Sequence, residues 1–266
     1  RDGAGVKPLY YYIDNDRLMF SSEIKSILSE PLVPRGLDKD ALDAYLTFRY
    51  VPAPDTLIKG VSKLVPGHAL LFSDNQVTLE NHESPALTQN QWEDEGALKR
   101  EVFQQLSSAV ERQMVSDVDV GLLLSGGVDS CALLAFMSEH ARVPVKTFTV
   151  GFEGDAVENE TSEARQAADY FEADHHEVLM GALDYRDMLP AVIEKLEEPV
   201  CTTSIIPFHF LAEMTGSSVK VALSGQGADE GFAGYTRYLG ERFGGSYRAL
   251  PGFVRRAVSQ MVNAAP

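Results

Sequence analysis

The sequence predicts an α/β protein built on a parallel β-sheet with helices on both faces. From Glu95 onward, short apolar segments alternate with longer amphipathic ones. The apolar segments are continuous, which is typical of strands buried on both faces. Strands and helices that alternate at these intervals indicate a parallel sheet. With 266 residues, 44% of them hydrophobic, the chain can bury a substantial core in one large domain or two smaller ones.

The first 85 residues have a different, β-rich character. A hairpin is predicted from Leu9–Ile13 and Leu18–Phe20, which flank the turn residues Asp14–Asp16. The other elements expected here are a short helix over 22–28, a helix over 38–48 behind the cap residue Asp38, and a strand–turn–strand unit from Leu57 to Phe72 around Pro66-Gly67. Residues 80–95 are polar and contain proline, so we expect a linker there and place the domain boundary between 85 and 86.

The second portion, residues 86–266, contains the elements of the predicted sheet. The expected strands are Val118–Leu124, Val145–Phe152, His175–Leu179 and Val219–Leu223. The expected helices are Leu98–Met114, Cys131–His140, Glu160–Phe171, Leu183–Leu196 and Phe208–Met214. Both ends of the chain look like cuts through a longer protein, so we expect this portion to be truncated at its C-terminus. Ligands of parallel sheets bind beyond the carboxyl ends of the strands.

The composition restricts the partners and the location of the protein. A net charge of −16 and a pI near 4.7 argue against nucleic acid as the main partner, because a polyanion would be repelled over most of the surface. No apolar segment approaches the ~20 residues needed to span a bilayer. No signal peptide opens the chain, so we expect a cytoplasmic protein with no membrane partner. The two cysteines, Cys131 and Cys201, do not suggest a disulfide framework.

The strongest functional signal is the string Ser-Gly-Gly-Val-Asp-Ser at Ser125–Ser130, called here the first loop. Adjacent glycines after a buried strand let the backbone turn sharply and point its N–H groups at a ligand. The helix that follows adds a partial positive charge, which suits a phosphate, and Ser125 and Ser130 can donate hydrogen bonds to its oxygens. Asp129 would repel a phosphate unless a cation lies between them, and Mg²⁺ binds carboxylates together with phosphates.

The alternative for the first loop is a plain strand-to-helix turn in which Ser125 caps the helix. The complete six-residue string in a strand–loop–helix context favours the functional interpretation. It is not a Walker loop, because the terminal Gly-Lys-Ser/Thr is missing, and it is not a dinucleotide fingerprint.

A second glycine-rich loop, Ser224–Glu230, follows the strand predicted at Val219–Leu223 and is called here the second loop. In a parallel sheet it lies on the same edge as the first loop. Asp129 and Asp229 can therefore share a magnesium–pyrophosphate cluster. The alternative is an acidic turn with a solvated Asp-Glu pair, and the presence of both loops favours a site.

The adjacent histidines His175 and His176 are the other candidate metal ligands. Neighbouring residues on a strand point to opposite faces, so the two cannot easily chelate one ion. A structural role is the favoured interpretation for both.

Both loops carry a resemblance to known families. The first loop resembles the pyrophosphate loop of ATP pyrophosphatases, and the second loop resembles the Ser-Gly-Glu-Gly-Ala-Asp-Glu…Gly-Gly-Tyr element of glutamine-hydrolysing asparagine synthetases. The likeness to the latter extends over nearly the whole chain. Its further segments are Arg1-Asp2, Gly5–Tyr11 and Ser22–Lys25, similar to the end of a glutaminase domain; Tyr45–Phe48, Tyr50–Pro54 and Pro66–His68, similar to the interdomain connection; and Glu160, Ala164-Arg165 and Asp174–Glu177, similar to the synthetase domain.

This resemblance implies an adenine-nucleotide alpha hydrolase-like fold, also called PP-loop, preceded by a partial glutaminase-domain remnant. It implies a reaction in which ATP adenylates the side-chain carboxylate of aspartate, pyrophosphate is released, and ammonia from glutamine displaces AMP to give asparagine. A second copy of the chain, in a homodimer, is a further partner to consider. The implied AMP contacts come from the backbones of Leu123, Val150, Ser224 and Gly225, the pyrophosphate contacts from Ser125, Gly126, Gly127 and Ser130, and the Mg²⁺ ligands are Asp129 and Asp229.

The candidate catalytic residues are Asp229, Glu230 and Gln226, and Gln226 departs from the resemblance. The family usually has an acidic residue there, which could act as a general base for the attacking ammonia, whereas an amide cannot. Gln226 either hydrogen-bonds the acyl-adenylate or packs in the loop without a role. Another carboxylate acceptor therefore stays open, as in related amidotransferases or enzymes like β-lactam synthetases. A non-catalytic nucleotide-binding module is the rival from another class.

Two further segments bear on the expected activity. Cys201–Ser204, called here the acceptor loop, lies where the family has part of its substrate pocket; a polar loop that caps a helix is the alternative. Glutaminase chemistry in this family needs an N-terminal cysteine, and neither Cys131 nor Cys201 is placed for that role. We therefore expect residues 1–85 to lack glutaminase activity on their own.

Overall fold

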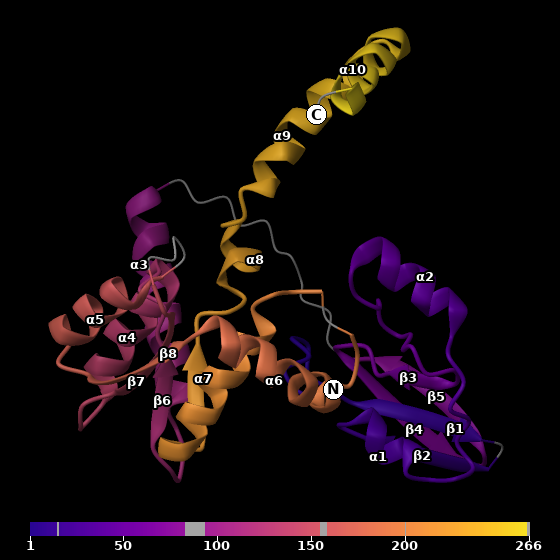
Figure 1. Ribbon diagram of the computed structural model, residues 1–266, viewed down its shortest axis with the longest axis horizontal. Coiled ribbons are helices and arrows are strands. Elements are labelled where there is room, and N and C mark those ends of the chain that lie inside the picture. Colours follow the sequence, from indigo (N-terminus) through magenta and orange to yellow (C-terminus); the bar gives the residue numbers. More distant parts are fainter. Residues whose placement is uncertain (15, 83–93, 155–158, 200, 265–266) are drawn as a thin grey trace. The chain divides into compact units, whose positions relative to one another are not determined.

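The structure is a computed structural model that describes residues 1–14, 16–82, 94–154, 159–199 and 201–264 (Figure 1). The chain forms two compact units. Unit one comprises Arg1–Glu101 and Met180–Ala212, and unit two comprises Val102–Leu179 and Glu213–Pro266. The division between 85 and 86 concerns domains of the sequence and stays a prediction.

Unit one is built on an antiparallel sheet of order β2-β1-β3. Strands β1 (Tyr10–Asp14) and β2 (Arg17–Ser21) form the hairpin predicted from the sequence, and β3 (Val61–Lys63) pairs with the other edge of β1. Helix α1 (Ile24–Leu28) packs on this sheet. The buried core here consists of Tyr10, Ile24, Ile27, Val33 and Val61.

Helix α2 (Lys39–Phe48) begins at the cap residue that the sequence predicts. The Asp38 carboxylate accepts hydrogen bonds of 3.0 Å from the backbone N–H groups of Asp40 and Ala41. These are two of the N–H groups that an α-helix leaves unpaired at its start, so the cap fixes where α2 begins.

The strand–turn–strand unit predicted between Leu57 and Phe72 is confirmed in its elements, because β3 and the next strand flank the turn at Pro66-Gly67, and these two strands lie in different sheets. Strand β4 (His68–Ser73) pairs with β5 (Gln76–Asn81), which lies partly in the segment predicted to be a linker. The two turn residues, Asp74 and Asn75, have positive φ of 51° and 62°. Two positive φ values characterise the type I′ turn, which matches the twist of a tight hairpin and therefore favours β4 with β5.

Unit two contains a four-stranded sheet of order β8-β7-β6-β9, which confirms the predicted α/β class. Strand β6 (Val120–Leu123) runs parallel to β7 (Lys146–Phe152) and to β9 (Val221–Ser224), and β8 (Asp174–Met180) flanks β7. Three consecutive residues of β7, Thr147–Thr149, are buried, so both faces of this strand are covered.

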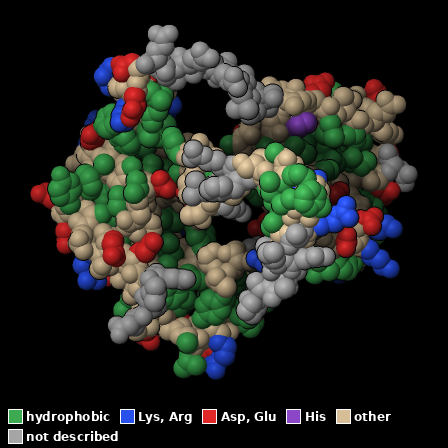
Figure 2. All heavy atoms as spheres, turned by 90° about the horizontal axis from the view of Figure 1, so that it is seen from above, with side chains coloured by type: hydrophobic (Ala, Val, Ile, Leu, Met, Phe, Trp, Pro, Cys, Tyr) green, Lys and Arg blue, Asp and Glu red, His purple; other side chains and the backbone are tan. Residues whose placement is uncertain are grey.

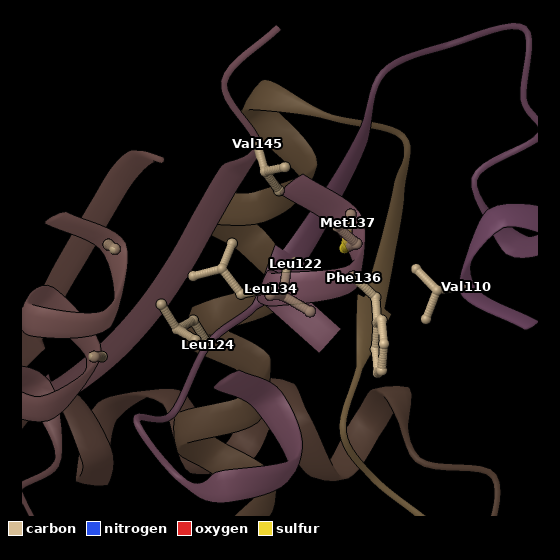
Figure 3. Close-up of a cluster of buried hydrophobic side chains, with 9 residues drawn as sticks. Val110, Leu122, Leu124, Leu134, Phe136, Met137 and Val145 are labelled. Atoms are coloured by element: carbon tan, nitrogen blue, oxygen red, sulfur yellow. The ribbon is translucent and has the colours of Figure 1, made fainter. Parts of the chain in front are cut away.

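Helices α3 (Glu95–Gln113), α4 (Val128–His140) and α5 (Thr161–Tyr170) accompany this sheet (Figure 1). Figure 3 shows their core, in which Leu122 and Leu124 meet Leu134 and Met137 of α4. Phe136 of α4 also packs edge-on against Phe103 of α3, with ring centroids 4.9 Å apart. This packing holds α4 against β6 and α3.

The chain continues through helices that the sequence did not fully predict. Helices α6 (Ala182–Lys195) and α7 (Ile205–Ser218) agree with expectation, and α7 is longer than predicted. After β9 come α8 (Ala228–Phe232), α9 (Arg237–Ala249) and α10 (Gly252–Ala264), and none of these three helices was expected from the sequence. Helix α9 contains three glycines, each of which costs about 1 kcal/mol relative to alanine in a helix interior. Among the described residues, none of the helices combines the length and apolarity that crossing a membrane requires.

The two histidines of β8 have separate partners. His175 hydrogen-bonds the Thr147 hydroxyl at 2.8 Å through Nδ1 and Glu177 at 3.0 Å through Nε2. His176 instead stacks on Phe148, with ring centroids 5.3 Å apart. Each imidazole therefore ties β8 to β7, in agreement with the structural role predicted for the pair.

Glu177 makes the stability of unit two depend on pH. Burial raises the pKa of Glu177, but the hydrogen bonds from Arg165 and His175 outweigh it and hold this pKa below its usual value of 4.5. A lowered pKa stabilises the fold above pH 4.5, and that contribution is lost as the pH falls through the pKa of the folded state. We expect Glu177→Gln to lower the free energy of unfolding at pH 7 by about 1–2 kcal/mol and to flatten its decline between pH 5 and pH 3. Urea unfolding at several pH values measures both effects, and an unchanged pH dependence would contradict this role of Glu177.

Candidate active site

The first and second loops follow two adjacent strands, β6 and β9. Between these strands the order in which the chain adds strands to the sheet reverses. From β6 the chain moves to β7 and then β8 on one side, and it returns to β9 on the other side. Leu123 is the last paired residue of β6 and lies opposite Ser224 of β9 and Phe148 of β7. The carboxyl ends of strands at such a switch point form the crevice where α/β proteins bind ligands. Val150 lies further along β7 at the same edge.

The first loop is held by the hydroxyl of Ser130, which is 5% exposed. Its Oγ accepts a hydrogen bond from the Ser125 N–H (3.2 Å), donates to the carbonyl of Gly127 (3.1 Å), and lies 3.1 Å from the Ser125 Oγ. The Ser125 side chain is exposed and accepts from the Gly127 N–H at 3.3 Å. Ser130 therefore braces the loop from inside, and Ser125 presents its hydroxyl to solvent.

Gly126 allows the first loop to lie directly on α5. Its φ is +70°, and a Cβ atom at this position would lie 2.6 Å from the Cβ of Glu163 and 2.7 Å from the backbone nitrogen of Ala164. No side chain fits there, and only glycine adopts this φ without strain. The sharp turn and close approach predicted from the paired glycines thus have a definite partner, which is the first turn of α5.

The start of α5 is the part of the site that sequence reasoning missed. It also packs on β7, because a Cβ at Gly151 would collide with the side chain of Thr161. A helix N-terminus thereby joins the carboxyl edge of the sheet, where its N–H groups add positive potential. Gly151 directly follows Val150 in a predicted strand, and this glycine was the available signal of a close backbone approach.

The second loop touches the first at the N-terminus of α4. A Cβ at Gly225 would lie 3.1 Å from the backbone nitrogen of Ser130 and 3.2 Å from the Cβ of Asp129. Gly227, with φ +94°, then starts the short helix α8. The sequence placed both loops on one edge of the sheet, and the structure brings them into van der Waals contact there.

The two candidate metal ligands lie on the elements that leave these loops. Asp129 is exposed in the first turn of α4, and Asp229 is half-buried in the first turn of α8. Within the described part of the chain, neither carboxylate has a hydrogen-bond or ion-pair partner. The Asp229 carboxylate lies over Gly234, where a Cβ would overlap its Oδ1. Both carboxylates can therefore bind a cation, although the described residues contain no group of three or more His, Cys, Asp or Glu suited to hold a metal without further ligands.

The other two candidate catalytic residues differ in their contacts. Glu230 is exposed and accepts a 2.8 Å hydrogen bond from the Tyr235 hydroxyl. The Gln226 backbone N–H donates to the Ser224 Oγ at 3.3 Å. Its side chain is exposed, and no residue in the described ranges hydrogen-bonds it. The geometry thus fixes the backbone of Gln226 and leaves its amide available to a ligand.

Both cysteines are free thiols. Cys131 is half-buried in α4, and burial raises the pKa of its thiol despite a hydrogen bond with Ser130. Cys201 is exposed in the acceptor loop, with its Sγ 3.0 Å from the Tyr45 hydroxyl. Neither cysteine is the N-terminal nucleophile that glutaminase chemistry needs in the family that the sequence resembles.

The surface charge does not by itself attract a phosphate. On the face shown in Figure 2, acidic side chains are spread among hydrophobic ones, and Lys and Arg form only small separate groups. The net charge is −16. Binding of an anion at the sheet edge must therefore rely on local donors, which are the backbone N–H groups of the first loop and the N-termini of α4 and α5.

Two family profiles match the chain. The family described as Asparagine synthase matches residues 101–264, and the family described as Glutamine amidotransferase domain matches residues 1–83. The first match includes both loops of the candidate site. The second covers β1 to β5 and thus the β-rich part of unit one.

Individual proteins show the same relationship. Glutamine-hydrolyzing asparagine synthetase 1 of Bacillus subtilis is 35% identical over 242 residues, which cover 90% of this chain and 37% of that protein. Glutamine-hydrolyzing asparagine synthetase 3 of the same organism is 32% identical over 253 residues, covering 88% of this chain and 40% of that protein. The NH3-dependent NAD synthetase of Campylobacter jejuni, solved with a nitrate ion, superposes with a TM-score of 0.37 at 14% identity, covering 51% of this chain and 60% of that one. The chain spans less than half the length of the two relatives from B. subtilis.

Proposed function

The chain belongs to the asparagine synthase family, and on that premise we propose that it is the ATP-using part of an amide-forming ligase. The observation that carries the proposal is the contact between the two loops. Gly225 of the second loop lies against Asp129 and Ser130 of the first, at the carboxyl ends of adjacent strands. This contact joins the N-terminus of α4, with its N–H donors and Asp129, to the loop that leads to Asp229 in α8, and it supports a site that cleaves a nucleoside triphosphate.

The proposed reaction joins a carboxylate to AMP and then to nitrogen. A carboxylate oxygen of the acceptor attacks the α-phosphorus of ATP, and pyrophosphate leaves. Ammonia then attacks the acyl carbon of the mixed anhydride, AMP leaves with the electron pair of the broken C–O bond, and the nitrogen loses a proton to form the amide. The first step turns a poor leaving oxygen into AMP, which is why the energy of ATP is needed.

Each residue of the site receives a role in this scheme. The backbones of Leu123, Val150, Ser224 and Gly225 contact AMP. Ser125, Gly126, Gly127 and Ser130 form the pyrophosphate cradle, in which Ser125 donates its exposed hydroxyl and Ser130 keeps the loop in shape. The exposed amide of Gln226 faces the acyl-adenylate, and Glu230 with Tyr235 supports the turn that carries Asp229.

Mg²⁺ is the proposed cofactor, held by Asp129 and Asp229. The chemistry of the site fits the ion, because both carboxylates are unpaired within the described residues and phosphate oxygens would supply further ligands. When bound, the metal neutralises charge that develops on the departing pyrophosphate.

Aspartate is the proposed acceptor, and ammonia derived from glutamine is the proposed nitrogen source. The support is family membership together with the amidotransferase match over residues 1–83. Gln226 favours a second candidate, in which a related amidotransferase acts on another carboxylate, because an amide cannot serve as the general base for ammonia.

Pyrophosphate release by the intact protein tests the ligase proposal. With ATP, Mg²⁺ and ammonium chloride, we expect aspartate to increase pyrophosphate release at least about tenfold above the rate without acceptor, because adenylation requires a carboxylate nucleophile. Succinate and glutamate serve as matched acceptors, and chromatography of AMP and asparagine identifies the products. Release that responds to another carboxylate and not to aspartate would favour the second candidate. No response to any carboxylate would exclude the ligase and favour a nucleotide-binding module.

A further inference from the structure

The peptide bond between Leu124 and Ser125, where β6 gives way to the first loop, is held at both of its polar ends. The Leu124 carbonyl accepts a 2.6 Å hydrogen bond from the Thr149 hydroxyl of β7. The N–H of the same peptide, on Ser125, donates to the Ser130 Oγ at 3.2 Å. A peptide unit is planar, so hydrogen bonds at its two opposite ends fix the orientation of the whole plane. All four residues belong to unit two.

The rest of Leu124 is fixed as well. Its N–H donates to the carbonyl of Phe148 at 2.9 Å, one position beyond the paired residues of β6 and β7. Its side chain is 2% exposed and packs in the core shown in Figure 3. The backbone rotation that turns the Leu124 carbonyl therefore decides how the chain enters the first loop, and the Thr149 hydroxyl sets that rotation.

Packing alone does not explain a hydroxyl at position 149. Thr149 is 3% exposed in β7, and burying a hydroxyl is unfavourable unless it finds a hydrogen-bond partner. A valine would fill the same space without a polar atom to satisfy. Thr147, which is completely buried in the same strand, has a different partner, because its hydroxyl bonds His175 of β8. Of these two buried hydroxyls, the one on Thr149 serves the start of the first loop.

We propose that Thr149 is a positioning residue of the nucleotide site, which together with Ser130 holds the first loop in its phosphate-binding shape before a nucleotide arrives. This inference rests on the proposed function for its ligand. Ser125 carries the exposed hydroxyl assigned to the pyrophosphate, and the peptide plane that leads into Ser125 is the one that the two hydroxyls hold. A loop ordered in advance loses less entropy on binding and so binds its ligand more tightly. Thr149 touches no ligand in this scheme and acts through the Leu124 carbonyl.

The test compares Thr149→Val and Thr149→Ser in the intact protein. Thr147→Val is the matched control, because it removes an equally buried hydroxyl from the same strand but leaves the Leu124 carbonyl bonded. In isothermal titration calorimetry, we expect Thr149→Val to weaken ATP binding about tenfold, the effect of one net hydrogen bond. AMP binding should stay within about twofold of wild type, because the first loop is assigned to the pyrophosphate. Thr149→Ser, which keeps the hydroxyl, should restore ATP binding, and Thr147→Val should bind both nucleotides like the wild type.

Hydrogen exchange gives a second measurement that needs no ligand. Peptides covering 124–130 should exchange about tenfold faster in Thr149→Val and should not change in Thr147→Val. Unchanged exchange in Thr149→Val would overturn the inference, and so would equal losses of ATP and AMP affinity or equal effects of the two valine variants. If the wild-type protein released no pyrophosphate with any carboxylate, the ligase proposal would fail, while ATP affinity and exchange would still decide whether Thr149 holds the loop.

Discussion

Replacing Gly126 by alanine is expected to abolish measurable ATP binding and to lower the free energy of unfolding by about 2–5 kcal/mol. Two effects add. An alanine with the φ of +70° found at Gly126 adopts the left-handed region, which costs about 1–2 kcal/mol. The new Cβ would also lie 2.7 Å from the backbone nitrogen of Ala164, and forcing extra volume into a packed contact costs about 1–3 kcal/mol. The backbone of α5 cannot rotate away as a side chain would, so the first loop must move.

Gly154→Ala separates these two effects. Gly154 has a similar φ of +88°, but a Cβ there would meet no atom of the described residues within 4 Å. We expect this control to lose only about 1–2 kcal/mol of stability and to bind ATP like the wild type. Denaturant unfolding and isothermal titration calorimetry measure both quantities. If Gly126→Ala lost no more stability than Gly154→Ala and kept its ATP affinity, the contact between the first loop and α5 would have no role in nucleotide binding.

The meeting of the two loops was largely predictable because its signals are local in sequence. Paired glycines after an apolar strand point to a loop that approaches a ligand, and parallel strands place such loops on one edge. The predicted meeting of the two loops rests on this reasoning, and Gly225 against Ser130 confirms it. The contribution of α5 was not predictable in this way, because nothing in the string around Glu163 shows that its backbone touches Gly126.

The errors in the predicted fold have a common physical cause. Local sequence preference for a helix or strand is weak wherever tertiary contacts determine which structure forms. Strand β5 offers only Val77 and Leu79 as apolar residues, so its pairing with β4 depends on the Asp74-Asn75 turn. The contact of Lys63 with Glu198 is likewise invisible in the sequence, since 135 residues separate the partners. Short-range periodicity predicts elements, whereas pairings at such separations appear only in the folded chain.

The largest expected effect on activity belongs to the two carboxylates proposed to bind Mg²⁺. We expect Asp129→Asn and Asp229→Asn each to lower pyrophosphate release about 100-fold or more, because a metal stabilises developing phosphate charge by several kcal/mol. The loss should appear in Mg-ATP binding, with the affinity for Mg-free AMP within about twofold of wild type, since AMP needs no metal for its proposed backbone contacts. Asp117→Asn is the control, because this exposed carboxylate precedes β6 and so lies at the opposite end of the strand.

The double variant decides whether the two carboxylates share one ion. If Asp129 and Asp229 bind the same Mg²⁺, removing the second ligand after the first lowers the rate of pyrophosphate release only slightly further. The double variant should then be nearly as active as the less active of the two single variants. Two independent roles would instead multiply the two losses. Magnesium titrations of pyrophosphate release measure the required concentration in each variant, and they should show the same upward shift for both singles. Equal losses of Mg-ATP and Mg-free AMP binding would show that the carboxylates act on the nucleotide or on the fold, and the metal site would have to lie elsewhere.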